Sequence, residues 1–307
     1  MNAIALSSDN GVSWTLPNNQ PFSSRGYKVG FDGKRVVMGG NSNIAYSDDF
    51  GVTWISTGFT SILNVYKIIY ISATTTWFAV GDNTNNQTMA RSTDGNNWTL
   101  LPNTLFDAGR CYDVIYNGST YIATGFSTNY PMAISSDGIT WNYNTTYTMT
   151  APVAQYGYFL LYDGIRYIIG GNGSTTNPAT GYSSTGNIST SPDGITWTTH
   201  NVSLPFDIRR IAYNGKDTYV GVGTKNGFIA GTIFYYWSND LINWYPANNN
   251  LFGINVYWVN WNGTYFVAGG DTTAGKSIIY SVDGKNWTAS TNSPFTTNGY
   301  GITSITY

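Results

Sequence analysis

The 307-residue sequence has no glutamate, one cysteine (Cys111) and one histidine (His200), and only 10% of its residues are charged. A single cysteine cannot form an internal disulfide, and one cysteine with one histidine cannot build a zinc site. No serine and aspartate motif surrounds the histidine, which argues against a histidine-based catalytic triad. A net charge of −2 with 14 scattered lysines and arginines does not suit nucleic acid as a partner. We therefore expect no metal and no cofactor.

Long apolar runs are also missing. The sequence has no stretch of 18 apolar residues, so we expect no membrane span. Residues 1–8 lack the basic and apolar pattern of a secretory signal, which indicates synthesis in a cytosol or a signal removed before this numbering begins. Residues that favour helices are scarce, whereas Gly, Asn, Thr, Ser and Tyr dominate. This composition predicts an all-β protein.

One short motif is present seven times. It first reads Ser7-Ser-Asp9-Asn-Gly11-Val-Ser13-Trp14, and from the third copy it is one residue shorter, as in Ser135-Ser-Asp137-Gly138-Ile-Thr140-Trp141. The sixth copy, Ser238 to Trp244, lacks the glycine. Successive motif tryptophans are 40, 44, 43, 56, 47 and 43 residues apart. A period of roughly 40 to 50 residues with strand-type segments between the motifs is typical of a β-propeller.

A second feature repeats in phase with the first. An apolar segment ends in an aromatic residue followed by Asp-Gly or Asn-Gly, which predicts a hairpin turn of type I′ with positive φ at both central positions. The second repeat departs from the rule with Tyr70-Ile71-Ser72. The copies are Phe31-Asp32-Gly33, Tyr116-Asn117-Gly118, Tyr162-Asp163-Gly164, Tyr213-Asn214-Gly215 and Trp261-Asn262-Gly263.

Each repeat is therefore interpreted as a four-stranded blade whose fourth strand carries the motif tryptophan. We predict one seven-bladed β-propeller domain over residues 1–307, in which residues 1–16 (with a strand from Ala3 to Leu6) and 299–307 share an incomplete closing blade. Placing both chain ends in one blade removes a free sheet edge. The six other blades are expected at 27–57, 64–100, 111–143, 155–199, 208–246 and 255–290.

The motif resembles the Asp-box of the BNR-repeat families, Ser-x-Asp-(x)-Gly-x-Thr-Trp, and the resemblance covers essentially the whole chain. It implies a propeller in which each aspartate caps backbone N–H groups of a turn and each tryptophan packs in the core, so both are assigned structural roles. The aspartates are Asp9, Asp49, Asp94, Asp137, Asp193, Asp240 and Asp283. The tryptophans are Trp14, Trp54, Trp98, Trp141, Trp197, Trp244 and Trp287.

The families that this motif resembles include sialidases, xyloglucan-type endoglucanases, sorting receptors and photosystem assembly factors. A sialidase of this family needs a tyrosine–glutamate pair, and the chain has no glutamate. An assembly factor of this family would show an arginine patch, whereas only Arg209 and Arg210 are adjacent here. A glycoside hydrolase using two aspartates stays open, with Asp107, Asp113 and Asp207 as weak catalytic candidates because they lie near the predicted first strands.

The start of each predicted first strand provides a candidate ligand surface. Aromatic and cationic residues recur there, and the first strand of a propeller blade lines the central axis. Such side chains suit stacking against sugars or flat ligands, although they could equally fill the space between blades. The candidates are Tyr27, Lys28, Tyr66, Lys67, Tyr112, Tyr158, Arg209, Arg210, Tyr257 and Trp258.

The surface composition, rich in Asn, Thr, Ser and Tyr, is typical of proteins exposed on virions, fibres and cell envelopes. The leading hypothesis is therefore a non-enzymatic binding or structural propeller on a virion, phage or cell surface, for attachment, decoration or glycan recognition. Its partner would be a glycan or another virion or surface protein. One alternative is the polysaccharide-active glycoside hydrolase with paired aspartates. Another is an intracellular protein-binding scaffold.

Overall fold

The computed structural model describes residues 3–83, 85, 87–102, 105–106, 109–147, 155–173, 186–202, 204, 206–224, 233–252, 255–273, 276–291 and 295. The chain divides into two compact units. Unit 1 comprises Met1–Leu6, Leu16–Thr148 and Ile305–Tyr307, and unit 2 comprises Ser7–Thr15 and Met149–Ser304.

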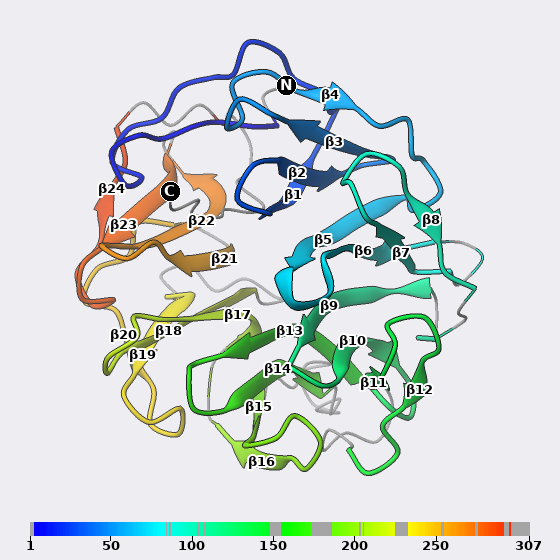
Figure 1. The fold of residues 1–307 in the computed structure, drawn as a ribbon. Helices are drawn as coiled ribbons and strands as arrows, with labels where there is room; N and C mark the ends of the chain where they lie inside the picture. Colours follow the sequence, from blue (N-terminus) through cyan, green and yellow to red (C-terminus); the bar gives the residue numbers. More distant parts are fainter. Residues whose placement is uncertain are drawn as a thin grey trace. The chain divides into compact units, whose positions relative to one another are not determined.

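Unit 1 contains three antiparallel meanders of four strands, in which each strand pairs with the next along the chain (Figure 1). A short 3-10 helix, η1 (Ser72–Thr74), connects β5 to β6, in the repeat that lacks the Asp-Gly or Asn-Gly turn. The strands are β1 (Gly26–Phe31), β2 (Val36–Gly40), β3 (Asn43–Ser47), β4 (Ile55–Ser56), β5 (Asn64–Ile71), β6 (Thr76–Asp82), β7 (Met89–Ser92), β8 (Thr99–Leu100), β9 (Cys111–Tyr116), β10 (Tyr121–Ser127), β11 (Met132–Ser135) and β12 (Asn142–Tyr143).

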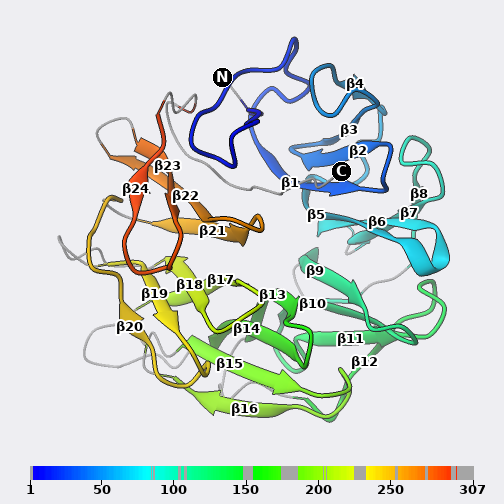
Figure 2. The same cartoon turned by 60° about the vertical axis from the view of Figure 1, so that its left-hand side comes forward.

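Unit 2 repeats the same meander three times, and the last strands within the described residues form the sheet β21 to β24 (Figure 2). Its strands are β13 (Gln155–Tyr162), β14 (Tyr167–Gly173), β15 (Gly186–Ser191), β16 (Thr198–Asn201), β17 (Asp207–Tyr213), β18 (Tyr219–Thr224), β19 (Tyr235–Ser238), β20 (Tyr245–Pro246), β21 (Val256–Trp261), β22 (Phe266–Thr273), β23 (Lys276–Ser281) and β24 (Thr288–Ala289).

The second strand of each meander forms the centre of the core. All residues of β2 and β18 are buried, as expected for strands that are covered on both faces. Within unit 1 the first strand β1 contacts β5, and β5 contacts β9. Within unit 2, β13 contacts β17 and β17 contacts β21. Each unit therefore brings its three first strands together.

The turns between first and second strands differ from the type I′ turns that the sequence predicts. Gly33 and Gly263 have positive φ values of 98° and 95°, but the residues before them do not have positive φ. Instead the Asp32 carboxylate accepts hydrogen bonds from the N–H groups of Lys34 and Arg35, at 2.8 and 2.6 Å. Asp32 therefore forms an Asx-turn. Because its side chain supplies the hydrogen bonds of the turn, only the glycine needs positive φ.

The fourth strands are shorter than predicted and do not contain the motif tryptophan. Trp54 and Trp98 directly precede β4 and β8, which have two residues each. The Trp54 backbone N–H donates to a side chain, Asn19 Oδ1, at 2.8 Å. The prediction that the fourth strand carries the tryptophan is therefore wrong by one residue.

The expected closing blade is described only in its N-terminal part. Ala3 to Leu6, predicted as a strand, shows only an isolated bridge at Leu6, and Ser13 forms a parallel bridge with Thr291. Residues 299–307 lie outside the described residues. Four sheets stand alone with four strands, and β9–β12 and β13–β16 repeat the same pairing. The described residues thus do not reach the predicted seven blades.

Candidate functional site

Every first strand has a β-bulge near its start. In β1, Gly26 pairs with Gly40 and Lys28 pairs with Gly39, so the register shifts at Tyr27. The same one-residue shift occurs in all six first strands. A bulge leaves one residue unpaired and changes the local direction of its side chain. The bulge residues are Tyr27, Tyr66, Tyr112, Tyr158, Arg209 and Tyr257, six of the ten ligand-binding candidates.

A glycine stands in the second strand opposite each bulge, where the backbone leaves no room for a side chain. A Cβ on Gly81 would lie 1.9 Å from the Asn64 carbonyl oxygen, and a Cβ on Gly223 would lie 2.1 Å from the Asp207 carbonyl oxygen. Sequence reasoning missed the bulges. Their signal is the glycine that follows the apolar part of every second strand, since a glycine inside a strand often marks a bulge.

In unit 1 the bulge residues form a continuous row of half-buried rings, which we call the tyrosine row (Tyr27, Tyr66 and Tyr112). The ring centroids of Tyr27 and Tyr66 are 5.3 Å apart with an edge-on geometry. Those of Tyr66 and Tyr112 are 5.5 Å apart. Both spacings are typical of favourable aromatic pairs. Three separate sheets thus contribute one aromatic surface.

A chain of polar side chains fixes the tyrosine hydroxyls. The Tyr66 hydroxyl donates to Asp82 Oδ2 at 2.7 Å, and the Tyr27 hydroxyl donates to Asn64 Oδ1 at 3.1 Å. Asn64 Nδ2 links the two by donating to Asp82 Oδ1 at 2.9 Å, while Asn41 Nδ2 donates to Asn64 Oδ1. Burial, together with the neighbouring Asp82 carboxylate, raises the pKa of Tyr66 well above its usual value. The rings are therefore held in place as neutral phenols.

The residues that directly follow the bulges have a different role in unit 1. Lys28 is half-buried, but Lys67 and Asp113 are buried and form an ion pair, with Nζ 2.5 Å from Oδ1. Asp113 Oδ1 also accepts a hydrogen bond from the Val114 N–H at 2.8 Å. This pair joins β5 to β9 inside the sheets. Lys67 and Asp113 are thus placed in the core rather than on the tyrosine row.

The other two weak catalytic candidates are Asp107 and Asp207. Asp107 lies outside the described residues. Asp207 begins β17 and is half-buried, two residues before the bulge residue Arg209. The geometry of the described candidates therefore does not assemble a pair of carboxylates within either unit.

In unit 2 the bulge residues are Tyr158, Arg209 and Tyr257, all half-buried. The Arg209 guanidinium lies over the Tyr158 ring, 4.0 Å from Cζ to the ring centroid, and its Nε donates to Thr224 Oγ1 at 2.8 Å. Tyr158 stacks in turn on Tyr156, at 5.5 Å and an interplanar angle of 24°. Among the residues that directly follow these bulge residues in the sequence, Arg210 is half-buried and Trp258 is buried.

The seven Ser-x-Asp motifs form turns with a shared hydrogen-bond pattern. In the fourth, Ser135 Oγ donates to Asp137 Oδ1 at 2.9 Å, and the same Oδ1 accepts the N–H groups of Ile139 and Thr140 at 2.8 Å. These bonds lower the pKa of Asp137 to about 2, with the N–H of Ile139 as the largest cause. The carboxylates are thus occupied by their own turns.

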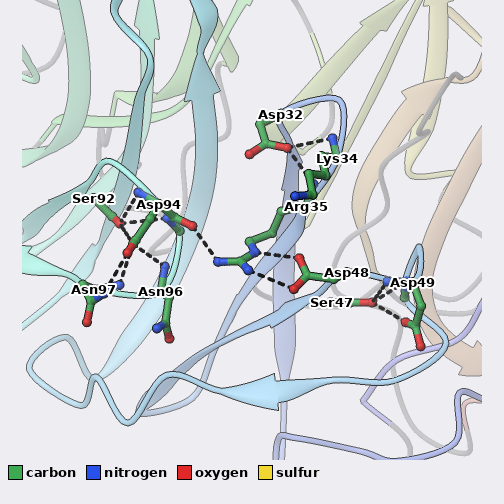
Figure 3. Close-up of polar contacts among 12 residues, drawn as sticks. Asp32, Lys34, Arg35, Ser47, Asp48, Asp49, Ser92, Asp94, Asn96 and Asn97 are labelled. Atoms are coloured by element: carbon green, nitrogen blue, oxygen red, sulfur yellow. Dashed lines mark hydrogen bonds and ion pairs between the residues drawn. The ribbon is translucent and has the colours of Figure 1, made fainter.

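Two of these turns are joined by one arginine in unit 1 (Figure 3). Arg35 makes a two-pronged ion pair with Asp48, through Nε to Oδ1 at 2.7 Å and Nη2 to Oδ2 at 2.8 Å. Its Nη1 donates to the Asp94 carbonyl oxygen at 2.8 Å, and its Cζ lies 4.1 Å from the Tyr46 ring centroid. This arginine connects the sheets of β1 and β7 and has a structural role.

The motif tryptophans are buried or half-buried, and six of the seven donate their indole N–H to the carbonyl oxygen at the glycine position of the same turn, at distances from 2.7 to 3.2 Å. The exception is Trp141, whose buried Nε1 has no partner within the described residues. In these six motifs the indole N–H is thus used inside the turn.

The described residues contain no group of three or more His, Cys, Asp or Glu side chains that could hold a metal ion. No helix among them is long and apolar enough to cross a membrane.

The comparisons with known proteins point to a fold. No family model matches the chain, and no curated protein matches it. Among solved structures it is similar to YCF48 bound to a D1 peptide, with a TM-score of 0.59 and 15% identity over 88% of this chain and 82% of that chain. It is also similar to the GH74 xyloglucanase from Xanthomonas campestris, with a TM-score of 0.60 and 13% identity over 86% of this chain.

This chain covers 45% of the xyloglucanase chain. At these identities the likeness concerns the fold alone, and the fold is that of a β-propeller. The all-β prediction and the propeller prediction are therefore confirmed.

Proposed function

We propose that the protein is a non-enzymatic binding propeller that recognises a glycan through its bulge residues. The observation that carries this proposal is the tyrosine row of unit 1, whose three rings are half-buried and in which the hydroxyls of Tyr27 and Tyr66 are fixed by Asn64 and Asp82. Aromatic faces beside oriented polar groups suit sugars, which present both apolar C–H faces and hydroxyls. Rigid rings lose little conformational entropy when a ligand binds.

Two observations favour binding over hydrolysis. Asp113 is buried and paired with Lys67, so it does not present a free carboxylate to a substrate. The motif aspartates accept hydrogen bonds from their own turns, as Asp137 does. A glycoside hydrolase needs one carboxyl group held protonated and another close to the same bond.

We also infer that the repeat is the Asp-box repeat of a seven-bladed propeller. The shared hydrogen bonds of all seven turns support this, as does the N-terminal turn. A Cβ on Gly11 would lie 3.0 Å from Val267 in β22, as a Cβ on Gly284 would lie 2.5 Å from Val220 in β18. The first turn thus packs on the last sheet as the turn of a following blade would. An experimental density map in which residues 299–307 pair elsewhere would contradict the seventh blade.

Exposure on a virion, phage or cell surface is part of the proposal. It is supported by composition alone, namely 10% charged residues and no glutamate. Antibody or gold labelling of intact particles or cells from the source would test it, because an internal protein would be labelled only after disruption.

The deciding experiment is a glycan array with the purified protein. We expect saturable binding to one sugar class, reduced roughly tenfold by Tyr27→Ala and by Tyr66→Ala, since tenfold corresponds to about 1.4 kcal/mol and an aromatic stacking contact is worth about 0.5–1.5 kcal/mol beyond the area it buries. Tyr245→Ala is the matched control, because this tyrosine is exposed on the outer strand β20. Absence of binding across a broad array, or turnover of a bound glycan, would overturn the proposal.

A further inference from the structure

The six bulge positions carry five tyrosines and one arginine, and the arginine is the exception in chemistry. Arg209 stands in unit 2 at the position that Tyr27 and Tyr66 occupy in unit 1. At an equivalent backbone position the change from a neutral phenol to a cation changes which ligand group can be bound there. The surroundings of Arg209 show how the cation is held.

Only part of the Arg209 guanidinium is bound by neighbouring side chains of the described residues. Its Nε donates to Thr224 Oγ1 at 2.8 Å, and its plane is covered by the Tyr158 ring at 4.0 Å. Within the described residues the two Nη groups have no hydrogen-bond partner, and the guanidinium makes no ion pair. This differs from Arg35 in unit 1, where Nε, Nη1 and Nη2 all donate.

Among the described residues, no carboxylate forms an ion pair with Arg209. A half-buried, partly desolvated guanidinium with two unused donors on one edge is suited to a planar anion such as a carboxylate, which can accept both donors.

An acceptor is also unused in the same unit. Asn255 stands two residues before the bulge residue Tyr257, as Asn64 stands two residues before Tyr66. Asn64 Oδ1 accepts the Tyr27 hydroxyl, whereas the buried Asn255 Oδ1 has no partner within the described residues. An unmatched buried acceptor is costly, so a hydroxyl donor at this position would be stabilised.

We infer that Arg209 is the carboxylate anchor of unit 2, and that the glycan recognised there is acidic, containing uronic acid residues. The sugar carboxylate would accept hydrogen bonds from the Nη groups, and the stacked pair Tyr156 and Tyr158 holds the guanidinium flat. This inference rests on the proposed function, that the bulge residues bind a glycan. It does not require the tyrosine row of unit 1 to contact the same sugar.

The test compares binding of oligogalacturonate and of its methyl ester by calorimetry. We expect the wild-type protein to bind the acid roughly tenfold or more tightly than the ester, because charge-assisted hydrogen bonds are about twice as strong as neutral ones. Arg209→Gln should abolish this preference. Arg209→Lys should restore it only in part, since an ammonium cannot make the two-pronged contact.

Arg210→Gln is the matched control, because Arg210 is the neighbouring half-buried arginine on the same strand. It should keep the preference. Thermal melting of each variant shows whether it is folded, and Arg209→Lys keeps the stacked cation if the glutamine variant is not.

The outcomes separate the two proposals. Equal binding of acid and ester, or a preference that Arg209→Gln leaves intact, overturns the carboxylate anchor and leaves glycan binding standing. Binding of neutral glycans alone has the same meaning. Absence of binding to every glycan overturns both.

Discussion

The two units share the same backbone feature, a β-bulge opposite a glycine, but differ in the side chains at the bulge. In unit 1 the bulge residues are all tyrosines, and the hydroxyls of Tyr27 and Tyr66 are bound by Asn64 and Asp82. In unit 2 an arginine takes one of the three positions and stacks on Tyr158. The bulge and its opposing glycine are common to both units, because they depend on main-chain geometry. The side chain at the bulge is free to vary, so under the proposed function this position determines which ligand group is bound.

The position after the bulge differs as well. Unit 1 places the buried ion pair of Lys67 and Asp113 there, whereas unit 2 places the buried rings of Phe159 and Trp258. An ion pair in this place depends on both partners, because a buried charge without its partner is costly. Aromatic rings have no such dependence.

Acid should affect both units alike, and the effect should be the largest because it acts on seven turns together. The pKa of each motif aspartate is lowered, to about 2 for Asp9, Asp137 and Asp240. A lowered pKa in the folded state gives stability that is present above about pH 4, the usual aspartate pKa, and that is lost as the pH falls through the folded pKa. Urea denaturation from pH 6 to pH 2 should show falling stability below about pH 4. A flat profile would contradict the role of these turns.

The largest single-residue effect is expected in unit 1. Asp113→Ala leaves Lys67 buried without its partner and should lower the free energy of unfolding by about 3–5 kcal/mol, measured by urea denaturation. The double variant Lys67→Met with Asp113→Leu should recover most of the loss, because it removes both charges. If the single variant is as stable as the double one, the ion pair is not what holds β5 to β9.

The bulge glycines should behave alike in the two units. Gly81→Ala and Gly223→Ala each place a Cβ within 2.1 Å of a carbonyl oxygen and should cost about 1–3 kcal/mol, as overpacking usually does. Equal losses in thermal or urea denaturation would support a shared backbone device. A loss confined to one unit would show that the other bulge can relax.

The hydroxyls of Tyr66 and Tyr27 should contribute different amounts to the free energy of unfolding. Tyr66→Phe removes a bond to the Asp82 carboxylate and should cost about 1.5 kcal/mol, whereas Tyr27→Phe removes a bond to a neutral amide and should cost about 0.5–1 kcal/mol. Urea denaturation of both variants measures the difference. The reverse order would mean that Asp82 is satisfied without Tyr66.

The smallest effect concerns a strained residue in a turn. Phe50 has φ of 59° and is exposed, and the equivalent Asn10 of unit 2 has φ of 61°. Phe50→Asn should raise the stability by a few tenths of a kcal/mol up to about 1 kcal/mol, because asparagine tolerates this conformation. Leu241→Asn, at φ of 69°, is the contrast: Leu241 is buried, so its loss should destabilise by about 1.5–3 kcal/mol. A fall in Tm for Phe50→Asn would contradict the strain argument.

Sequence reasoning placed the first-strand candidates in one repeating series, but it could not predict that the series follows a β-bulge in each first strand. The shift of one residue between Val65 and Lys67 follows from how β5 pairs with β6, and pairing register is a property of two strands together. It also could not separate Lys67 from Lys28. Both follow a bulge, yet Lys67 is buried in an ion pair with Asp113 whereas Lys28 is half-buried.

The sequence by itself determined the all-β propeller class and the seven Ser-x-Asp turns. These depend on residue types at short, regular spacing, where local hydrogen bonds such as those of Asp137 decide the conformation. Only the tertiary structure decided that Tyr27, Tyr66 and Tyr112 form one row, that Asp113 is buried, and that the two Nη groups of Arg209 have no hydrogen-bond partner within the described residues. Those properties arise when strands far apart in sequence are brought into contact, and no local pattern encodes the distance between them.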